Sequence, residues 1–416
     1  MQSGGCKRDT VPVAVGQWYN FYEFGYHLGN VGLSNLRNLI QGKERDMASN
    51  DHPPFRADIV GSLLRPHELK DARGSHERGE ITAADLRTVE DKFIRDAVAM
   101  QEEVGLQAVT DGEFRRRQFH MDFLSGIDGI EVEGEITVRF RNEHGETEYR
   151  PRNLVVADKL RHPQGGIQVE DFKFLKSVTS RAPKVCIPGP GYIYARGGWA
   201  AIEKTYEDKE TFFADVAQVY CEELAMLSEA GCTYVQIDDT NFSHACDAKF
   251  QDRYRNLGED PDEIPHIFAR MIADVVRGRP DGMTICLHLC HGNFRSSWAS
   301  EGGYEHVADA VFRETGIDAF FLEFDTPKSG DFAPLRYVPE DKTVVLGLVT
   351  TKHPELEPKN DLKRRIEEAS RYVPLDYLAL SPQCGFASTI EGNELTEDNQ
   401  IRKLRLVVEV AKEVWS

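Results

Sequence analysis

The sequence predicts an α/β protein and, within that class, a (β/α)8 TIM barrel, from three observations. Short apolar runs alternate with longer amphipathic stretches from Arg56 onward, which is typical of strands joined by crossover helices. Eight of these runs can be interpreted as strands, which is the strand count of a closed barrel. No G-x-G-x-x-G pattern follows the first run, which disfavours an open doubly wound sheet as the alternative.

The predicted elements follow one another in the order that a barrel requires. Residues 83–104 show the helical pattern, with an apolar stripe on one side and charged residues opposite. The helix predicted over 209–230 ends before Gly231, and glycine commonly terminates helices. The predicted strands are 57–64, 107–111, 184–188, 233–238, 283–290, 319–324, 343–349 and 377–381, and the other predicted helices are 264–276, 303–314, 361–372 and 398–415.

Residues 130–150 interrupt this alternation between the second and third predicted strands. Apolar and polar residues alternate over 130–140, a turn sequence follows at 142–145, and a second short run covers 147–150. The pattern predicts a β-hairpin inserted at the rim of the barrel. Because the segment carries several charges, we expect it to decorate the rim or cover the site rather than join the core.

The first 46 residues differ in character from the rest. They mix glycine, asparagine and aromatic residues without sustained periodicity, and they lack the tripartite pattern of a secretory signal. Met47 opens a plausible natural start. We expect residues 1–46 to be a disordered or loosely attached extension, with a docked arm or a targeting segment as the alternative, and residues 47–416 to form the barrel.

Composition narrows the class of function. The chain has 69 acidic and 50 basic residues, a formal net charge of −19, and an acidic surface repels phosphate backbones. No stretch approaches the roughly 20 apolar residues that a membrane helix needs. Eight cysteines in 416 residues are too few for a disulfide scaffold. We therefore expect a cytoplasmic protein that binds neither nucleic acid nor membrane, and the sequence leaves its oligomeric state open.

Four potential metal ligands stand at the carboxyl ends of three predicted strands, where the active sites of barrels lie. His288 and Cys290 are two residues apart, so on a strand both point to the same face. Glu323 ends the sixth predicted strand and Cys384 follows the eighth. One imidazole, two thiolates and one carboxylate suit a four-coordinate zinc site. Taken singly, each could instead be a core histidine, a small core cysteine or an ion-paired glutamate.

The ligand types also indicate what zinc would do. Zinc hydrolases favour neutral histidines, which keep the metal electrophilic and acidify its bound water. Two thiolates and a carboxylate make the site negative instead, so it can hold a substrate thiolate and leave it nucleophilic. The set therefore points to alkyl transfer onto a thiol, with a closed structural zinc site as the competing interpretation.

Further polar residues end other predicted strands. Ser62 lies in the first strand, Glu113 follows the second, and Asp238 ends the fourth on the same face as Gln236. Carboxylates that converge on one rim could bind an ammonium group. Pairing with the arginines at 115–117 is the alternative.

As a set, these motifs resemble the C-terminal catalytic barrel of cobalamin-independent methionine synthase, in particular its short single-barrel homologues. The resemblance implies zinc bound by His288, Cys290, Glu323 and Cys384. It also implies recognition of an amino-acid thiol by Ser62, Glu113 and Asp238, and methyl transfer from a folate to homocysteine that forms methionine, as in a 5-methyltetrahydropteroyltriglutamate–homocysteine methyltransferase. The likeness covers Arg56 to Trp415 and rests on Val60-Gly61-Ser62-Leu63-Leu64-Arg65-Pro66, Thr110-Asp111-Gly112-Glu113, Gln236-Ile237-Asp238-Asp239, His288-Leu289-Cys290, Leu322-Glu323 and Ser381-Pro382-Gln383-Cys384-Gly385.

Two departures from the family pattern leave the methyl donor and the proton donor open. The long members have a second barrel that helps to hold the folate, and residues 1–55 cannot replace it, so methylfolate, methylcobalamin and other methyl compounds all remain candidates. Lys352 takes the position of a histidine thought to relay a proton, with His353 one residue further on. The alternatives are a zinc-dependent thiol alkyltransferase or lyase that uses an epoxide or another non-folate electrophile, and a non-catalytic zinc-binding homologue.

Overall fold

Six parallel strands form the main sheet of the structure, a computed structural model that describes residues 52–416. Their spatial order is β12-β11-β10-β9-β8-β7, so consecutive strands are neighbours throughout. The strands are buried almost end to end, as parallel strands are when helices cover them. The bounds are Val185–Pro188 for β7, Tyr234–Asp239 for β8, Thr284–Leu289 for β9, Ala319–Glu323 for β10, Thr343–Val349 for β11 and Leu378–Pro382 for β12.

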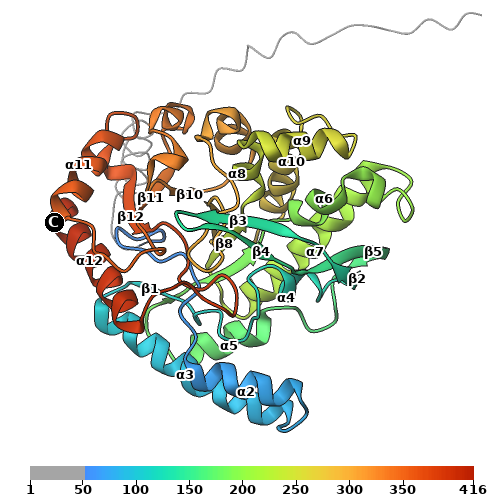
Figure 1. Ribbon diagram of the computed structural model, residues 1–416, viewed down its shortest axis with the longest axis horizontal. Helices are drawn as coiled ribbons and strands as arrows, with labels where there is room; N and C mark the ends of the chain where they lie inside the picture. Colours follow the sequence, from blue (N-terminus) through green and yellow to red (C-terminus); the bar gives the residue numbers. More distant parts are fainter. Residues whose placement is uncertain (1–51) are drawn as a thin grey trace, which may run out of the picture. The chain divides into compact units, whose positions relative to one another are not determined.

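Helices surround these strands (Figure 1). Helix α3 starts with a capping box at Thr82 and ends at Gly105, which adopts the left-handed φ of 97° that favours glycine. The predicted helix 303–314 is instead a 3-10 turn, Tyr304–His306, and a π-helical turn, Ala310–Glu314. The α-helices are α2 (His67–Glu77), α3 (Ala83–Val104), α4 (Met121–Leu124), α5 (Val169–Ser177), α6 (Gly191–Gly197), α7 (Lys209–Glu229), α8 (Asn241–Ala245), α9 (Ala248–Asn256), α10 (Ile264–Arg277), α11 (Lys359–Ala369) and α12 (Glu397–Trp415). No helix within residues 52–416 is long and apolar enough to cross a membrane.

The first two predicted strands are much shorter than expected. Strand β1 (Ala108–Val109) pairs with β6 (Ala182–Pro183), and residues 57–64 form only an isolated bridge from Ala57 to Leu380. Thr110 donates to the carbonyl of Gly61 and Gln236 to that of Val60, so side chains as well as the backbone hold this segment against its neighbours. The α/β class is confirmed, whereas closure into an eight-stranded barrel stays a prediction.

Residues 128–161 form two antiparallel strand pairs. Strand β2 (Asp128–Glu135) pairs with β5 (Arg152–Arg161), and β3 (Val138–Asn142) pairs with β4 (Gly145–Tyr149). The single arm predicted over 130–140 is therefore divided between two pairs, and Gly134, with a φ of 59°, lies just before the division. The turn expected at 142–145 is present, with the amide N–H of His144 donating to the side chain of Asn142 (2.9 Å).

The β3–β4 pair packs against the loop that follows β9. Arg141 and Trp298 exchange both backbone hydrogen bonds, at 2.8 and 3.0 Å. Phe140, Tyr149 and Phe294 form a small buried aromatic cluster at this contact. The insertion is therefore anchored by buried aromatic side chains, in addition to the surface charges seen in its sequence. The predicted extension, residues 1–46, lies outside the described residues.

Candidate metal and substrate site

A pocket of about 130 Å³ lies at the carboxyl ends of β8, β9 and β12. Asp238, His288 and Cys384 line one side of it, and the aromatic residues Phe140 and Tyr149 of the β3–β4 pair line another. Six of the seven predicted site residues border this space: Ser62, Glu113, Asp238, His288, Cys290 and Cys384. The predicted strand ends thus converge on one cavity, and the insertion supplies part of its wall.

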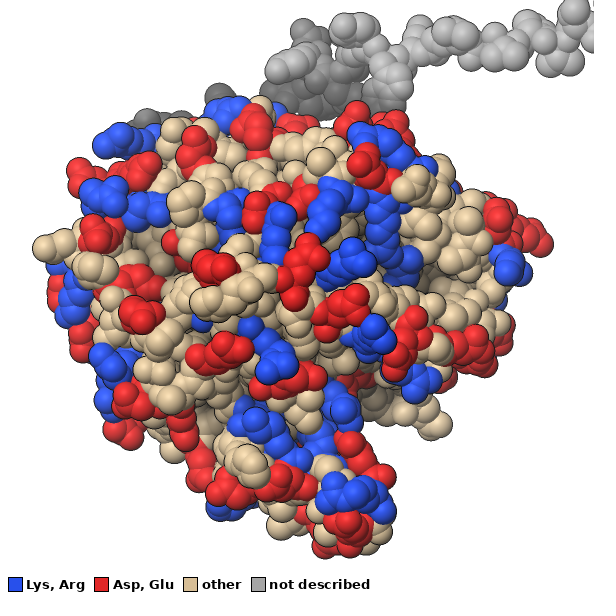
Figure 2. All heavy atoms as spheres, in the orientation of Figure 1, with Lys and Arg blue, Asp and Glu red and all other residues tan. Residues whose placement is uncertain are grey.

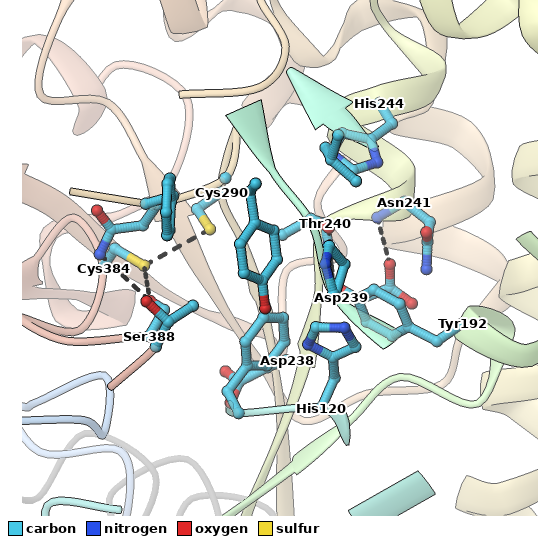
Figure 3. Close-up of a pocket in the computed structure, with 18 of the residues that line it drawn as sticks. His120, Tyr192, Asp238, Asp239, Thr240, Asn241, His244, Cys290, Cys384 and Ser388 are labelled. Atoms are coloured by element: carbon cyan, nitrogen blue, oxygen red, sulfur yellow. Dashed lines mark hydrogen bonds between the residues drawn. The ribbon is translucent and has the colours of Figure 1, made fainter. Parts of the chain in front are cut away.

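Three of the predicted metal ligands form a tight group, named here the sulfur cluster: His288, Cys290 and Cys384. Their ligand atoms all lie within 4.8 Å of one another, and the two sulfurs are 3.6 Å apart. Figure 3 shows both sulfurs facing the same part of the pocket. Among residues 52–416, the buried His288 has no partner for its ring nitrogens other than the thiol of Cys384. A buried imidazole whose only partner is a thiol fits zinc, which would take one ring nitrogen and the two sulfurs as ligands.

The two thiols hold their protons very differently. The sulfur–sulfur hydrogen bond with Cys290 lowers the pKa of the Cys384 thiol well below its usual range, and the positive charges of His288 and Lys352 act in the same direction. The same hydrogen bond raises the pKa of Cys290 well above its usual range, and burial adds to this effect. The pair therefore carries one negative charge and one proton, and a divalent cation would displace that proton.

Glu323 does not join the sulfur cluster in this structure. Its Oε1 lies 2.5 Å from Nζ of Lys328 and 3.8 Å from Nζ of Lys352. Its other oxygen accepts a 2.7 Å hydrogen bond from the backbone N–H of His291. Burial opposes ionisation, but the two ammonium groups hold the pKa of Glu323 well below its usual range. As a fourth metal ligand, this carboxylate would have to exchange the ammonium of Lys328 for the metal.

A second group, named here the carboxylate subsite, consists of Glu113 and Asp238. Their oxygens lie with the sulfur of Cys186 within 4.8 Å of one another, and all three residues are buried. Burial raises the pKa of Glu113 to about 7 and that of Asp238 to about 6. Oδ1 of Asp238 accepts from Gln236 (2.6 Å), whereas Oε2 of Glu113 accepts no hydrogen bond among the described residues. Oε2 of Glu113 does lie 3.9 Å from Nη1 of the buried Arg116, so the alternative of pairing with the arginines at 115–117 holds for Glu113 at ion-pair distance, whereas Asp238 has no arginine partner among residues 52–416. Both carboxyl groups can still accept a hydrogen bond from an incoming cation.

Unusual backbone geometry occurs at two positions of the site, Glu113 and Gly385. Glu113 has a φ of 58°, the left-handed region that a non-glycine residue enters at an energetic cost and that clusters at functional sites. Gly385 follows Cys384, and a Cβ at that position would stand 2.0 Å from Oγ of Ser62. The loop that carries Cys384 can therefore approach the Ser62 segment only because residue 385 is glycine.

Several residues in the pocket, or in contact with its lining, stand in no motif of the sequence. Lys328 comes from a 3-10 turn, Pro327–Ser329, and Cys186 from an apolar strand, so neither stands in a motif. The pocket is also lined by residues from loops and helices: Phe119, His120, Tyr192, Arg196 and Arg253. Only a three-dimensional arrangement brings these side chains to the strand ends. Lys352 was visible in the sequence as a departure from the family pattern, but its ion pair with Glu323 was not.

Comparisons with known proteins show the family of the chain. Residues 55–413 match the family model described as the catalytic domain of cobalamin-independent synthase. The chain is 47% identical over 371 residues to the uncharacterized protein YxjH of Bacillus subtilis, which covers 87% of this chain and 95% of that protein. It is 27% identical to a methionine synthase of Pyrococcus abyssi, covering 80% of this chain and 86% of the other.

A solved structure shares the fold. It is described as the "Putative Vitamin-B12 Independent Methionine Synthase" from Listeria monocytogenes and is 36% identical to this chain. The match has a TM-score of 0.69 and covers 87% of this chain and 98% of that one.

Proposed function

The chain belongs to the cobalamin-independent methionine synthase family, and on that premise we propose that it is a zinc-dependent methyltransferase acting on the thiol of homocysteine or a similar small thiol. The product is methionine or an analogous thioether. One observation carries the proposal: the sulfur cluster and the carboxylate subsite line the same pocket. A thiol that also bears an ammonium group can reach both at once.

In this proposal, His288, Cys290 and Cys384 would hold zinc, and Glu323 would be the fourth ligand if it exchanged the ammonium of Lys328 for the metal. Zinc stabilises a substrate thiolate at neutral pH, and its thiolate ligands keep that sulfur nucleophilic. The open space beside the cysteines supports a substrate-accessible site over a closed structural one. The fold is the (β/α)8 barrel, supported by hydrogen bonds that join residues 56–58 to Leu380 and Leu63 to Gly112.

The chain's own residues orient the thiol and balance its charge. Glu113 and Asp238 accept the ammonium group, and each is largely ionised above about pH 7. Ser62 stands beside the Cys384 loop, where it can contact the amino-acid portion of the substrate. Lys328 and Lys352 compensate the charge of Glu323, which limits the negative charge that a substrate thiolate would meet.

Turnover on zinc-loaded protein tests the proposal directly. Homocysteine is supplied with a panel of methyl donors that includes methylfolate, its polyglutamate, methylcobalamin and small methyl compounds, and methionine is detected by mass spectrometry. We expect methionine with at least one donor, and none with a Cys384→Ser variant. No methionine with any donor, despite full zinc content and thiol binding, would contradict the methyltransferase.

The alternative is a zinc-dependent thiol alkyltransferase with a non-folate electrophile such as an epoxide. The wall formed by Phe140, Tyr149 and Phe294 favours it, because an apolar electrophile would pack against these rings. Formation of a thioether from homocysteine and a small epoxide, with no transfer from any methyl donor, would establish this alternative.

A further inference from the structure

Two arginines line the pocket without a carboxylate partner. Arg196 is in α6 and Arg253 is in α9. Nη2 of Arg196 lies 2.8 Å from Nε2 of His120, and Arg253 donates to the backbone oxygen of Arg196 (3.1 Å). Nη1 of Arg196 is buried and has no hydrogen-bond partner, and neither arginine forms an ion pair within the described part of the chain. A guanidinium in this condition lacks the anion that would normally compensate its burial.

His120 adds a third donor to this group. A guanidinium can only donate, so Nε2 of His120 accepts from Arg196 and the ring proton must stand on Nδ1. Burial, together with the charge of Arg196, lowers the pKa of His120 well below its usual range, so the ring is neutral. Its Nδ1–H has no partner among residues 52–416, and the residue is only 6% exposed. Arg196 and His120 therefore offer unused hydrogen-bond donors, Nη1 of Arg196 and Nδ1 of His120, and neither side chain offers a free acceptor.

The surroundings favour a negatively charged ligand at this place. Aromatic contacts hold the ring of His120, which stacks on Tyr192 with 5.3 Å between ring centroids. The nearby carboxyl group of Asp239 accepts from the N–H of Asn241 (2.6 Å), and burial raises its pKa to about 7, so its repulsion is partial near neutral pH. Figure 2 shows basic side chains gathered over the β3–β4 pair and toward α6, although the chain as a whole is acidic.

We propose that Arg196, Arg253 and His120 form an anion-binding subsite that holds an acidic group of the methyl donor, a carboxylate, sulfonate or phosphate. The assignment to the donor rests on the proposed function. The ammonium of the thiol is already matched by Glu113 and Asp238, and Figure 3 places the two sulfurs at one side of the pocket with His120 and Tyr192 away from them. A donor anchored by its acidic group would lie between this subsite and the sulfur cluster.

Calorimetry with two methylated pterins tests the subsite on zinc-loaded protein. One ligand is 5-methyltetrahydropteroylglutamate, whose tail ends in carboxylates, and the other is the corresponding methylated pterin without that tail. The variants are Arg196→Met and Arg253→Met, which remove the donors but keep an unbranched side chain. Arg139→Met is the matched control, because Arg139 lies on β3 and is exposed, outside the pocket lining. Inorganic sulfate serves as the competing small anion.

We expect wild type to bind the acidic pterin about ten- to a hundredfold more tightly than the one without the tail. Each pocket variant should lose most of this preference, Arg139→Met should keep it, and sulfate should compete with the acidic pterin. Equal binding of both pterins to wild type, or an unchanged preference in both pocket variants, would overturn the subsite. Competition of sulfate with homocysteine instead would assign the anion to the thiol and overturn the assignment to the donor.

Two further measurements distinguish loss of the subsite from loss of the folded protein. Zinc content and thermal unfolding identify a variant that fails to fold, and Arg253→Met decides the matter if Arg196→Met does fail, because Arg196 also contacts the sulfur of Met121. A failure of the proposed function is distinct: arginine-dependent binding of the acidic pterin without any methyl transfer would leave the subsite intact and contradict the methyltransferase.

Discussion

Glu323 and Asp238 are both buried carboxyl groups at the carboxyl ends of neighbouring parts of one sheet, yet their surroundings are opposite. Glu323 faces the ammonium groups of Lys328 and Lys352, and its pKa is far below the usual range. Asp238 accepts from the neutral Gln236 and forms no ion pair among the described residues, and burial raises its pKa to about 6. The negative charge of Glu323 is compensated by two lysines, whereas that of Asp238 has no cationic partner in an ion pair among the described residues.

The difference separates two tasks at the site. Glu323 with Lys328 and Lys352, named here the lysine-paired region, lies outside the pocket lining but keeps a fixed negative charge close enough to act on Cys290, and the two lysines limit the net charge there. The carboxylate subsite is poised to gain a cation, and its affinity for one rises with pH as Glu113 and Asp238 ionise between about pH 6 and 7. A substrate ammonium is therefore expected at Asp238 and not at Glu323.

The largest expected effect is loss of the metal. Purified protein should hold about one zinc per chain, and Cys290→Ser or Cys384→Ser should each lose most of it, because an alcohol is a poor zinc ligand. Elemental analysis measures the content. Cys221→Ser and Cys232→Ser are controls, because neither cysteine lines the pocket. Full zinc in both cluster variants would remove the proposed site.

The second effect tests the lysine-paired region. Lys328→Met should destabilise the zinc-free protein by about 3–5 kcal/mol, since it leaves Glu323 buried with only the more distant Lys352 as a counter-charge. Denaturant unfolding measures the change. Lys359→Met is the control, because its ion pairs with Glu409 and Glu413 are on the surface. Equal free energies of unfolding for Lys328→Met and Lys359→Met would show that the buried ion pair at Glu323 stabilises the protein no more than a surface pair does.

The third effect is a gain in stability when the charge of Asp239 is removed, since this buried carboxyl group forms no ion pair among the described residues. Burial raises the pKa of Asp239 to about 7 in the folded protein, above its ordinary value of 3.8, so ionisation costs stability as pH rises between these values. Asp239→Asn keeps an acceptor for the N–H of Asn241 and should stabilise the protein by about 1–3 kcal/mol at pH 8. Below about pH 3, under the ordinary value of 3.8, the carboxyl is mostly protonated in both states and the gain should vanish. Thermal unfolding across pH measures it, and a gain independent of pH would point to packing instead.

The sequence indicates some of these features and not others, for physical reasons. His288 and Cys290 could be placed on one face because a strand repeats every two residues wherever it lies in the fold. The shortness of the first strand could not be foreseen, since its extent depends on pairing with residues far along the chain, and that pairing is limited to a bridge from Ala57 to Leu380. The partners of Glu323 were hidden likewise, because Lys328 reaches it from a loop.

The division of the inserted segment was also invisible in its alternation of apolar and polar residues. A regular period of two fits one long strand as well as two shorter ones. The break before Val138 follows from pairing with distant residues, since β2 pairs with β5 and β3 with β4. The anion-binding residues of α6 and α9 carry no motif for the same reason: only tertiary packing brings them to the pocket.

The most direct test of the central claim is a calorimetric comparison of two thiols on zinc-loaded wild type and Asp238→Asn. The thiols are homocysteine and 4-mercaptobutanoate, which is homocysteine without its amino group. Asn keeps the shape but removes the charge, so homocysteine should bind the variant about ten- to a hundredfold more weakly, while 4-mercaptobutanoate should bind both proteins alike and zinc content should not change. Equal weakening of both thiols would make Asp238 structural, and a wild-type preference for 4-mercaptobutanoate would contradict an amino-acid acceptor.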